Sequence, residues 1–387
     1  MFENRDKRII AIKNAKLDTP QIRKINRKAV FDYIRECPGV TKAKLASVLE
    51  LSRPTVSNIV DELEKGGLIQ GKKDTTNTGG RNAMGYACIS DAYRTVGIQL
   101  SSHHIRGVVI DMLGDIIGKI NIKKVFGTDE AYRKALGEAY QELLREAGIR
   151  EDDVAGVGVT VQALTDKEGT KVTYVPAEST SLSRYDQLLK YIPGQKRLFH
   201  DLIALGYNEK LQVDENVFYL SVNNRIGGMI LINNQVYYGS NNRAGEVGHM
   251  KIQHKGRKCY CGNEGCFDAY CNTGILRKCA DGSLDDFFRG LQEGNEDYKA
   301  CFQEYIEYLA DAIFSIRITF DGVIVIGGSL GMYSEYYLDD LRDLLDQKTF
   351  FPDDRASEYL QADQLGTFAI AIGASMYYNN HILDQFD

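Results

Sequence analysis

The sequence predicts an α/β protein in which an N-terminal winged helix-turn-helix is followed by a two-lobed α/β body. Two observations lead to this fold class. Residues 1–81 carry 17 lysines and arginines against 10 acidic residues, whereas the rest of the chain carries 30 against 43. From about residue 93, short glycine-punctuated apolar segments alternate with longer helical ones, which is typical of layered strands and helices. A basic head on an acidic body indicates that the head binds a polyanion and the body a different ligand.

The length and composition predict two or three cytoplasmic domains. At 387 residues the chain is too long for one small core. It has no run of about 18 apolar residues, so we expect no transmembrane helix and no membrane partner. The first ten residues, MFENRDKRII, lack the apolar core of a signal peptide. Eight cysteines spread over this length do not form the disulfide framework of a small secreted protein.

The head reads as three short helices. Four apolar residues recur at helical spacing and are expected to form the buried face of the first helix: Ile22, Ile25, Ala29 and Tyr33. Thr41 can cap a second helix. Ser52 can cap a third, with Pro54 in its first turn, where a missing N–H does no harm. Gly66-Gly67 is expected to end this third helix.

The third helix of such a motif enters the major groove of DNA. Residues 67–89 then form two short strands around a polar, glycine-rich tip, which is typical of a wing that reaches phosphates or the minor groove. The predicted DNA contacts are polar residues near the helix starts and basic residues of the wing: Thr41, Ser52, Arg53, Thr55, Ser57, Asn58, Lys72, Lys73 and Arg81. We therefore predict a double-stranded DNA operator as a partner.

Two blocks of strands, beginning near residues 95 and 217, predict two lobes in the body. Strands are expected at TVGIQL, VAGVGVTV, NVFYLSV and GVIVIGGSL, and helices at the segments that begin DEAYRKAL and EDYKACF. We divide the chain into a head of residues 1–86, a first lobe of residues 90–202 that includes residues 368–387, and a second lobe of residues 203–367. Such lobes commonly hold a small ligand in the cleft between them.

Three cysteines crowd into eight residues in the stretch KCYCGNEGC. Cys259, Cys261 and Cys266 offer three thiolates and His249 can add an imidazole, which is the ligand set of a closed structural zinc site. Four protein ligands leave no open position for catalysis, and the spacing lacks the second ligand pair of a DNA-reading zinc finger. The sequence thus predicts one structural Zn²⁺. Two further cysteines are interpreted as core thiols: Cys271 and Cys279.

The run RAGEVGHMKIQHKGRKCYCGNEGCFDAY resembles the signature of the ROK family, which contains sugar kinases and sugar-responsive repressors. The segments VIVIGGSL and AIGASM are similar to that family as well, and the head resembles the winged helix of its repressor branch. The resemblance covers nearly the whole chain. It implies an actin- and hexokinase-like body, the same four zinc ligands, and a sugar or sugar phosphate as effector. Two-fold assemblies that read palindromic half-sites are expected, as a homodimer or homotetramer.

The resemblance also implies sugar contacts. The family uses an Asn-Asp pair, the glutamate and histidine of a GExGH segment, and an acid after the third cysteine. The matching positions here are His200, Asp201, Glu246, His249 and Asp268. His200 replaces the asparagine, and Asp268 stands where glutamate is usual. Carboxylates and imidazoles suit a polyol ligand. If His249 ligates zinc with one nitrogen, its other nitrogen is expected to be free for a sugar hydroxyl.

Both phosphate cradles of the family's kinases are altered in this chain. The first, a D-x-G-G-T turn in kinases, reads GIQLSSHH, with Gln99 in place of the acid that serves magnesium. The second reads SVNNRIGG, with Asn223, Asn224 and Arg225 at its start. Asp201 stands at the position of the kinase base, but we expect no well-held phosphoryl group for it to act on. We therefore predict no catalytic residue and interpret the protein as a sugar-responsive transcriptional regulator, a repressor.

Two alternatives stay open from the sequence. One is a sugar kinase that retains a DNA-binding head, which would turn over ATP with a hexose. The other is a scaffold-like regulator whose pocket binds no sugar and whose partner is another protein. Sugar binding and ATP turnover distinguish the three.

Overall fold

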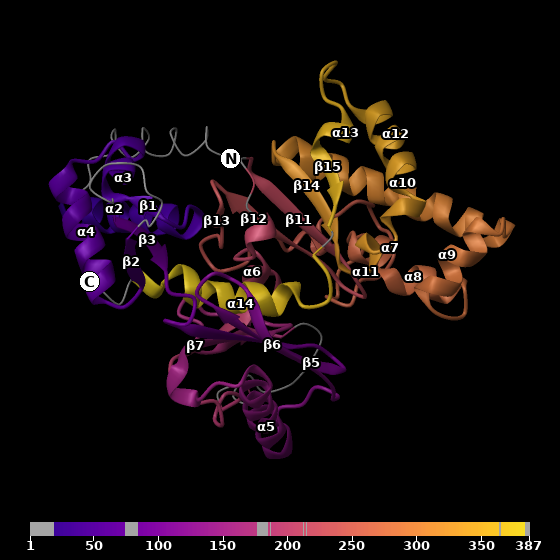
Figure 1. The fold of residues 1–387 in the computed structure, drawn as a ribbon. Coiled ribbons are helices and arrows are strands. Elements are labelled where there is room, and N and C mark those ends of the chain that lie inside the picture. The colour runs from indigo at the N-terminus through magenta and orange to yellow at the C-terminus, as the bar shows by residue number, and fades with distance from the viewer. Residues whose placement is uncertain are drawn as a thin grey trace.

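The protein is described by a computed structural model that covers residues 19–73, 84–175, 185, 187–211, 213, 215–363 and 365–383 (Figure 1). A small head lies at one end of the body, and the body is built on two five-stranded sheets. Among these residues, no helix is both long enough and apolar enough to cross a membrane.

The head is a winged helix, as predicted. Its helices are α2 (Thr19–Glu36), α3 (Lys42–Val48) and α4 (Arg53–Lys65), and its sheet has the order β1 (Val40–Thr41), β3 (Met84–Cys88), β2 (Ile69–Lys73). Thr41 caps α3 by accepting a hydrogen bond from the N–H of Lys44, and Ser52 caps α4 by accepting one from Thr55. At Gly67 a φ of +72° lets the chain leave α4, which is the predicted end of this helix.

The buried face of α2 is only partly the predicted one. Tyr33 is 6 % exposed, but Ile22 is 41 % exposed, so its prediction as a buried residue was wrong. The core of the head begins later along α2, at Val30, Phe31 and Ile34, which are at most 3 % exposed. Periodicity identifies which side of a helix is apolar, but not how far along the helix its packing partner reaches.

The first lobe contains a sheet of order β10-β7-β4-β5-β6. Its strands are β4 (Arg94–Leu100), β5 (His104–Asp111), β6 (Ile116–Lys123), β7 (Val154–Val161) and β10 (Lys196–His200). β4, β5 and β6 form an antiparallel meander, and β7 runs parallel to both β4 and β10. A small hairpin of β8 (Leu164–Thr165) and β9 (Val172–Tyr174) and a 3-10 turn, η1 (Glu151–Asp153), complete the strand layer.

Two helices cover opposite faces of this sheet. α5 (Glu130–Ala147) buries one apolar face in the lobe-one core, and α14 (Ala369–Asn380) lies against β4 and β7 on the other face. α14 approaches the strands at backbone distance, because a Cβ added at Gly97 would lie 1.8 Å from the carbonyl oxygen of Ala371. The C-terminal helix is thus part of the first lobe, although most of the second lobe separates it from that lobe in sequence.

The second lobe contains a sheet of order β13-β12-β11-β14-β15. Its strands are β11 (Val217–Val222), β12 (Ile226–Ile232), β13 (Gln235–Val236), β14 (Val323–Gly327) and β15 (Leu360–Ala362). Its helices and 3-10 turns are η3 (Glu209–Leu211), η4 (Val247–His249), α7 (Asp268–Cys271), α8 (Thr273–Cys279), α9 (Leu284–Gln292), α10 (Glu296–Thr319), α11 (Gly328–Gly331), η5 (Ser334–Tyr336), α12 (Leu338–Lys348) and α13 (Ala356–Tyr359). Between the lobes lies the short helix α6 (Asp201–Leu205).

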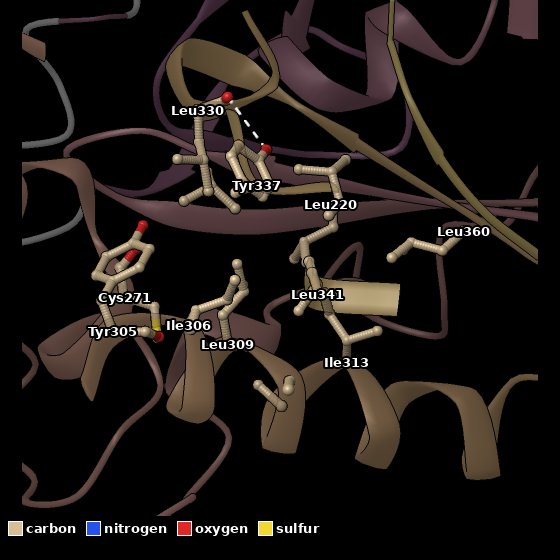
Figure 2. Packing of buried hydrophobic residues seen from close by; sticks show 14 of the residues in the cluster. Leu220, Cys271, Tyr305, Ile306, Leu309, Ile313, Leu330, Tyr337, Leu341 and Leu360 are labelled. Atoms are coloured by element: carbon tan, nitrogen blue, oxygen red, sulfur yellow. Dashed lines mark hydrogen bonds between the residues drawn. The ribbon is translucent and has the colours of Figure 1, made fainter. Parts of the chain in front are cut away.

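The core of the second lobe forms between α10 and the sheet (Figure 2). Ile306, Leu309 and Ile313 lie along one face of α10 and point toward Leu220 of β11 and Leu341 of α12. The tyrosine hydroxyls in this view have partners, since Tyr337 donates to the carbonyl of Leu330 at 3.1 Å and Tyr305 donates to the carbonyl of Cys271 at 2.5 Å. Helix α10 includes the EDYKACF segment that was predicted to be helical.

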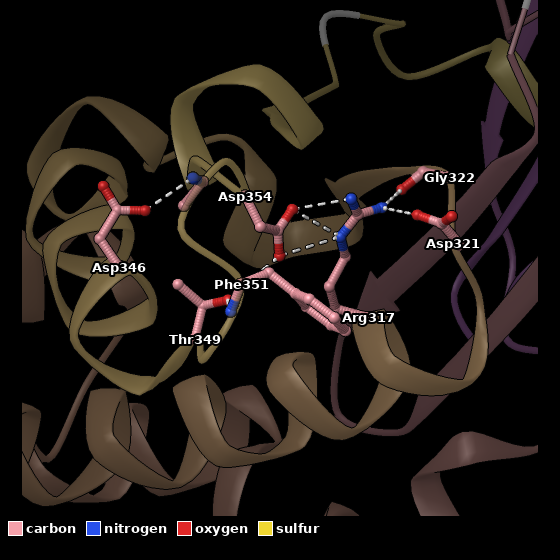
Figure 3. A network of polar contacts seen from close by, with 8 residues as sticks. Arg317, Asp321, Gly322, Asp346, Thr349, Phe351 and Asp354 are labelled. Carbon is pink, nitrogen blue, oxygen red and sulfur yellow. Dashed lines mark hydrogen bonds and ion pairs between the residues drawn. The ribbon is translucent and has the colours of Figure 1, made fainter.

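A polar network holds the loop between α12 and α13 (Figure 3). Arg317 at the end of α10 bonds the Asp354 carboxylate at 2.8 Å and the Gly322 carbonyl at 3.0 Å, and it pairs with Asp321. Asp346 accepts from the backbone of Ala356 at 2.7 Å. The network connects α10 and α12 to the segment that leads into the edge strand β15.

The cysteines outside the KCYCGNEGC stretch correct one prediction. Cys271 is fully buried, as predicted for a core thiol. Cys279 is not a core thiol, because it lies exposed at the end of α8 and forms a disulfide with Cys301 of α10. The pairing depends on the packing of α8 beside α10, which the spacing of cysteines in the sequence does not reveal.

Candidate effector, metal and DNA-binding sites

The four predicted metal ligands lie together in the second lobe. His249 ends η4, and the cysteines belong to the loop that leads into α7. His249 Nδ1 lies 3.8 Å from the Cys259 sulfur, the Cys261 and Cys266 sulfurs are 3.8 Å apart, and all four donor atoms lie within 4.8 Å of one another. A tetrahedral ion with sulfur ligands at about 2.3 Å would hold two sulfurs about 3.8 Å apart. The donor set therefore fits a metal ion.

Glycines allow this loop to close around its ligands. Gly262 and Gly265 have φ angles of +89° and +77°, in the left-handed region that favours glycine. A Cβ at Gly265 would also lie 1.7 Å from the carbonyl oxygen of Gln253. Two isolated bridges, Lys251 to Cys266 and Lys258 to Glu264, tie the two ends of the loop together. The backbone alone therefore brings the cysteines to one side.

The second nitrogen of His249 is not free, contrary to the expectation from sequence. Its Nε2 lies 3.2 Å from the hydroxyl of Tyr260, and the guanidinium of Arg225 covers the ring of Tyr260 at 3.3 Å from the centroid. Tyr260 sits between two cysteine ligands, so the turn that brings the thiols together also directs its side chain toward the imidazole. Sequence reasoning missed this residue, although its place inside C-Y-C was a usable signal.

Asp201 and Thr160 form a buried polar pair with unsatisfied atoms. Asp201 begins α6 and is 6 % exposed, and Thr160 on the neighbouring strand β7 is fully buried. Asp201 Oδ1 and Thr160 Oγ1 have no hydrogen-bond partner within the described chain. Leaving such atoms unmatched costs about 1–3 kcal/mol each, so a ligand hydroxyl or a water that bonded to them would be favoured here.

Burial shifts the two titratable groups at this position in opposite directions. It raises the pKa of Asp201 to about 6, although the nearby Thr160 hydroxyl, which does not reach hydrogen-bond geometry with the carboxylate, acts in the opposite direction. It lowers the pKa of His200, the last residue of β10, to about 4. At neutral pH Asp201 is therefore a carboxylate and the neighbouring His200 an uncharged imidazole. The carboxylate can accept hydrogen bonds from hydroxyl groups, and the imidazole can donate or accept them.

The acids of the second lobe have different environments. Glu246, just before η4, has an exposed side chain. Desolvation by the surrounding protein nevertheless raises the pKa of Glu246, and the charge of His249 acts in the opposite direction. Asp268, at the start of α7, is 3 % exposed and accepts a hydrogen bond from the N–H of Ile226 at 2.7 Å. Burial raises the pKa of Asp268 as well. One oxygen of Asp268 is thus engaged with the strand, and the carboxylate has less to offer a ligand than the sequence suggested.

Asp268 and residues next to two other predicted effector residues lie near the first two residues of β12. Asp268 binds the N–H of Ile226, and a Cβ at Gly248, next to His249, would lie 2.2 Å from the Ile226 carbonyl oxygen. From the other lobe, Leu202, the neighbour of Asp201, reaches Gly227, where a Cβ would lie 3.1 Å from its side chain. Segments of both lobes that carry predicted effector residues therefore pack against the start of this strand.

The first altered phosphate cradle is occupied by side-chain contacts. Gln99 Oε1 lies 3.5 Å from Arg106 across the β4–β5 pair, and Ser102 donates to Gln162 at 3.2 Å. These contacts fill the hairpin with polar side chains instead of exposing its backbone N–H groups.

The second cradle is occupied in the same way. Asn223 accepts from the N–H of Ser329 at 2.8 Å and from its hydroxyl at 2.7 Å, and Asn224 accepts from Arg277 at 3.0 Å. A Cβ at Gly327 would lie 1.8 Å from the Tyr219 hydroxyl oxygen, so this glycine serves close packing. The N–H of Ser329, in the first turn of α11, is thus not open to an anion.

In the head, the predicted DNA contacts divide into exposed groups and groups with structural partners. Arg53 and Asn58 are exposed on α4, and Lys72 is exposed on β2. The caps Thr41 and Ser52 are bonded to the backbone, and the Ser52 hydroxyl also meets that of Thr55 at 2.8 Å. Two predicted contacts lie outside the described residues: the side chain of Lys73 and all of Arg81.

Sequence reasoning missed Lys42 in the head. Its Nζ lies 3.1 Å from the Ser57 hydroxyl and 2.5 Å from Asp61 on α4, and it sits 5.5 Å from the Tyr86 ring centroid on β3. One ammonium thus connects α3, α4 and β3. Ser57 is held by this contact and by Asp61, so it is less available to DNA than Asn58.

Comparisons with known proteins agree with this division into head and body. Residues 95–381 match the model of the ROK family, and residues 30–78 that of the MarR family. The xylose repressor of Bacillus subtilis (strain 168) is 24 % identical over 385 residues, covering 95 % of this chain and 98 % of that protein.

Two solved structures have the same fold over different extents. A ROK family transcriptional regulator, described as a homolog of the E. coli MLC protein, is 19 % identical with a TM-score of 0.76 and covers 94 % of this chain and 98 % of its own. The ROK hexokinase of Thermus thermophilus is 23 % identical with a TM-score of 0.60 and covers 76 % of this chain and all of its own.

Proposed function

The chain belongs to the ROK family, and on that premise we propose that it is a sugar-responsive transcriptional repressor. The observation that carries the proposal is the union of a winged helix with a ROK body in one chain. The similarity to the B. subtilis xylose repressor runs through both parts. We propose double-stranded operator DNA as the ligand of the head and a sugar or sugar phosphate as the ligand of the body.

The effector is proposed to bind between the lobes. Asp201 and His200 would hold hydroxyl groups from the first lobe, and Glu246 would do so from the second. The unmatched oxygens of Asp201 and Thr160 support this position, because a ligand hydroxyl can satisfy both. Asp268 and His249 are proposed to position the residues that line the pocket and not to bind the effector directly, since each already has a protein partner.

Phosphoryl transfer is not part of the proposal. Both phosphate cradles contain internal hydrogen bonds, in which Ser102 donates and Asn223 and Asn224 accept. Asp201 could accept a proton from a sugar hydroxyl, but a kinase also needs a magnesium-bound phosphoryl group held in line with that hydroxyl.

The metal is proposed to be a structural Zn²⁺ held by His249, Cys259, Cys261 and Cys266. Three thiolates and one imidazole at tetrahedral separations favour zinc over hard cations. A bound ion would fix the loop that carries Glu246 and Asp268. It would contribute to folding and not to chemistry, because four protein ligands leave no open position.

The remaining proposals concern organisation. We propose that the head spans residues 1–86, the first lobe residues 90–202 with 368–387, and the second lobe residues 203–367. A homodimer or homotetramer would present two heads to a palindromic operator, and the protein would act in the cytoplasm. DNA contacts are proposed from Arg53, Asn58 and Lys72, because these side chains are exposed on the expected DNA face.

The test is a thermal-shift panel of xylose, glucose, N-acetylglucosamine and their phosphates, with and without Mg-ATP. One sugar class should stabilise the protein, by about 2.7 kcal/mol when present at 100 times its Kd. The Asp201→Asn variant should lose that response. The same ligand should then change the affinity for a DNA duplex selected from a random pool.

Two outcomes would overturn the proposal. Turnover of ATP with any sugar of the panel would identify a kinase with a DNA-binding head. Selective DNA binding without a thermal shift from any sugar would identify a regulator whose pocket is inactive and whose partner is another macromolecule.

A further inference from the structure

We propose that Arg27 is a positioning residue that anchors the recognition helix α4 to the C-terminal end of the body. Through this anchor the start of α6, the C-terminal helix α14 and α4 form one continuous structural unit. The assignment of α4 to DNA and of α6 to the effector pocket rests on the proposed function, whereas the anchor itself rests on the contacts described below.

At the head end, a buried guanidinium joins three segments. Arg27 on α2 is 3 % exposed, its Nη1 donates to the carbonyl of Leu383 at 3.3 Å, and its Nε lies 3.2 Å from the carboxylate of Glu62 on α4. A charged side chain is rarely this buried unless it is paired. The pairing partners here are the recognition helix and the last described residue of the body.

The C-terminal residues enter the core of the head. Ile382 and Leu383, 2 % and 6 % exposed, pack in the same apolar cluster as the buried side chains of α2 and α4. Met112, from the turn between β5 and β6, joins this cluster and is 1 % exposed. The head is therefore docked on the body through a shared apolar core and is not only tethered by the chain at residue 89.

Between the head and the pocket, α14 is fixed to the first lobe by buried contacts. The hydroxyls of Ser375 and Thr95 on β4 are 2.8 Å apart, and Asn379 donates to the carbonyl of Asp111 at 2.9 Å. The backbone of α14 lies directly on Gly97, as described above. Figure 1 shows α14 extending from the junction of the two lobes to the head.

At the pocket end, α14 is fixed to α6. A Cβ at Gly373 would lie 2.1 Å from the carbonyl oxygen of Ala204, so the two helices touch backbone to backbone. Asn208, which is 3 % exposed, donates to the carbonyl of Ala369 at 3.2 Å. Because α6 begins with Asp201, a displacement of this residue by a ligand acts on α14 without an intervening flexible segment.

A second contact between head and body is weaker. Arg35 of α2 pairs with Glu209 of η3 at 3.0 Å, but the Glu209 side chain is 45 % exposed. Exposed ion pairs of this kind contribute little and are screened by salt. The buried pair of Arg27 and Glu62, backed by Leu383, is therefore the contact that should fix the orientation of α4.

The chain supplies a matched control for Arg27. Arg23 is on the same helix and pairs with the same carboxylate of Glu62 at 2.9 Å, but its side chain is 66 % exposed, whereas that of Arg27 is 3 % exposed. Arg27→Met removes the charge and its bonds while keeping an apolar stem of similar length. Arg23→Met makes the same change one helical turn away.

The experiment compares full-length wild type, Arg27→Met and Arg23→Met by calorimetry and amide hydrogen exchange, without sugar or DNA. Wild type and Arg23→Met should unfold the head together with the first lobe. Arg27→Met should release the head as a separate transition at lower temperature. Its exchange should rise about tenfold or more in α4 and also at the end of α14, because α14 loses its partner in the head.

Leu383→Ala keeps the test decisive if Arg27→Met does not fold. It leaves every side chain of α2 and α4 intact, but it removes the Leu383 side chain that holds the acceptor carbonyl of Arg27 in the core of the head, so it should also raise exchange in α4. Two results would overturn the anchor: Arg27→Met behaving like Arg23→Met, or Leu383→Ala leaving exchange in α4 unchanged. Neither readout depends on the effector, so a failed sugar panel and a failed anchor are distinguishable.

Discussion

At the scale of single residues, Asp201 differs most from an ordinary surface carboxylate. It is buried, one oxygen lacks a partner within the described chain, and burial raises its pKa to about 6. A fold selected only for stability would not retain such a group, because an unmatched buried charge is unfavourable. Residues kept against stability are typical of binding sites.

Replacing Asp201 by Asn should therefore stabilise the protein at neutral pH while abolishing sugar binding. The carboxyl binds its proton more strongly in the folded protein than in the unfolded chain, so its contribution favours folding below pH 4. That contribution is lost as the pH rises to about 6. The side-chain amide of the variant does not titrate and has no such loss. The free energy of unfolding of the variant should therefore rise relative to that of wild type by up to about 3 kcal/mol between pH 4 and pH 7.

Chemical denaturation at both pH values measures the difference. A variant that is less stable than wild type at pH 7 would mean that Asp201 has a favourable partner in the folded protein. It would then be a structural residue.

In the head, the exposed residues of α4 and its capping residue should respond differently to substitution. Arg53→Ala and Asn58→Ala should each weaken operator binding by about five- to 150-fold, since one good base contact is worth about 1–3 kcal/mol. Their melting temperatures should not change, because both side chains are exposed. Ser52→Ala should instead lower stability by about 1 kcal/mol, because its hydroxyl caps α4.

Binding isotherms and thermal melts on the same preparations separate the two effects. Loss of stability in the Arg53 and Asn58 variants, with unchanged DNA binding, would contradict the assignment of this helix face to DNA.

At the scale of elements, the loop of residues 249–268 connects the proposed metal site to the proposed effector site. His249, a proposed metal ligand, ends η4 and touches Tyr260, and Asp268 begins α7 just after the last cysteine. The loop needs left-handed glycines at 262 and 265 to bring the thiols together. The metal site is therefore interpreted as the support of the pocket and not as a centre of chemistry.

Cys266→Ser should reduce zinc from about one per chain to a small fraction and lower the thermal stability of the second lobe. It should weaken the response of DNA binding to sugar, while the intrinsic contacts of the winged helix remain. Cys271→Ala is the control, because this buried cysteine is not among the ligands and should leave the zinc content unchanged.

Metal analysis and sugar-dependent DNA binding, measured side by side, check this prediction. A Cys266→Ser protein with full zinc content, or with a full sugar response, would separate the cysteines from the function.

At the scale of the whole molecule, charge and architecture agree. The body carries the acidic excess and the head the basic one, although the net charge of the chain is -6. An acidic body repels DNA, so attraction should be confined to the head and its orientation should matter. The buried contacts of Arg27, Ile382 and Leu383 supply that orientation.

Operator binding should therefore depend steeply on salt, in spite of the negative net charge. A head that makes six phosphate contacts would lose about a thousandfold in affinity between 50 and 200 mM salt. Removing one phosphate contact, as in Lys72→Gln, should reduce the slope of log K against log salt by about one. A slope near zero would mean that the head does not bind the DNA backbone.

Much of the fold could be predicted from local pattern. The short, glycine-punctuated apolar segment VAGVGVTV predicted the strand Val154–Val161, and the helical stretches that begin DEAYRKAL and EDYKACF predicted Glu130–Ala147 and Glu296–Thr319. The caps Thr41 and Ser52 were predictable because a hydroxyl at the N-cap acts on the next three residues only. Where the physics is local, the sequence is sufficient.

The candidate site was predictable in its residues but not in its partners. The metal ligands and Asp201 follow from motif and resemblance. The contacts of His249 with Tyr260 and of Asp268 with Ile226 do not, because they depend on how a loop folds back on a strand. The Cys279–Cys301 disulfide and the exposed Ile22 belong to the same class.

By itself the sequence determined the winged helix, the two-lobed body and the cluster of thiols, since each is encoded in periodicity, composition or spacing over a few tens of residues. Only the tertiary structure decided that Leu383 lies in the core of the head and that Arg27 joins it to Glu62. Such contacts link residues more than 300 positions apart, and no local preference specifies them. They form because burying a guanidinium is favourable only where the packed elements supply an opposite charge and an acceptor for it.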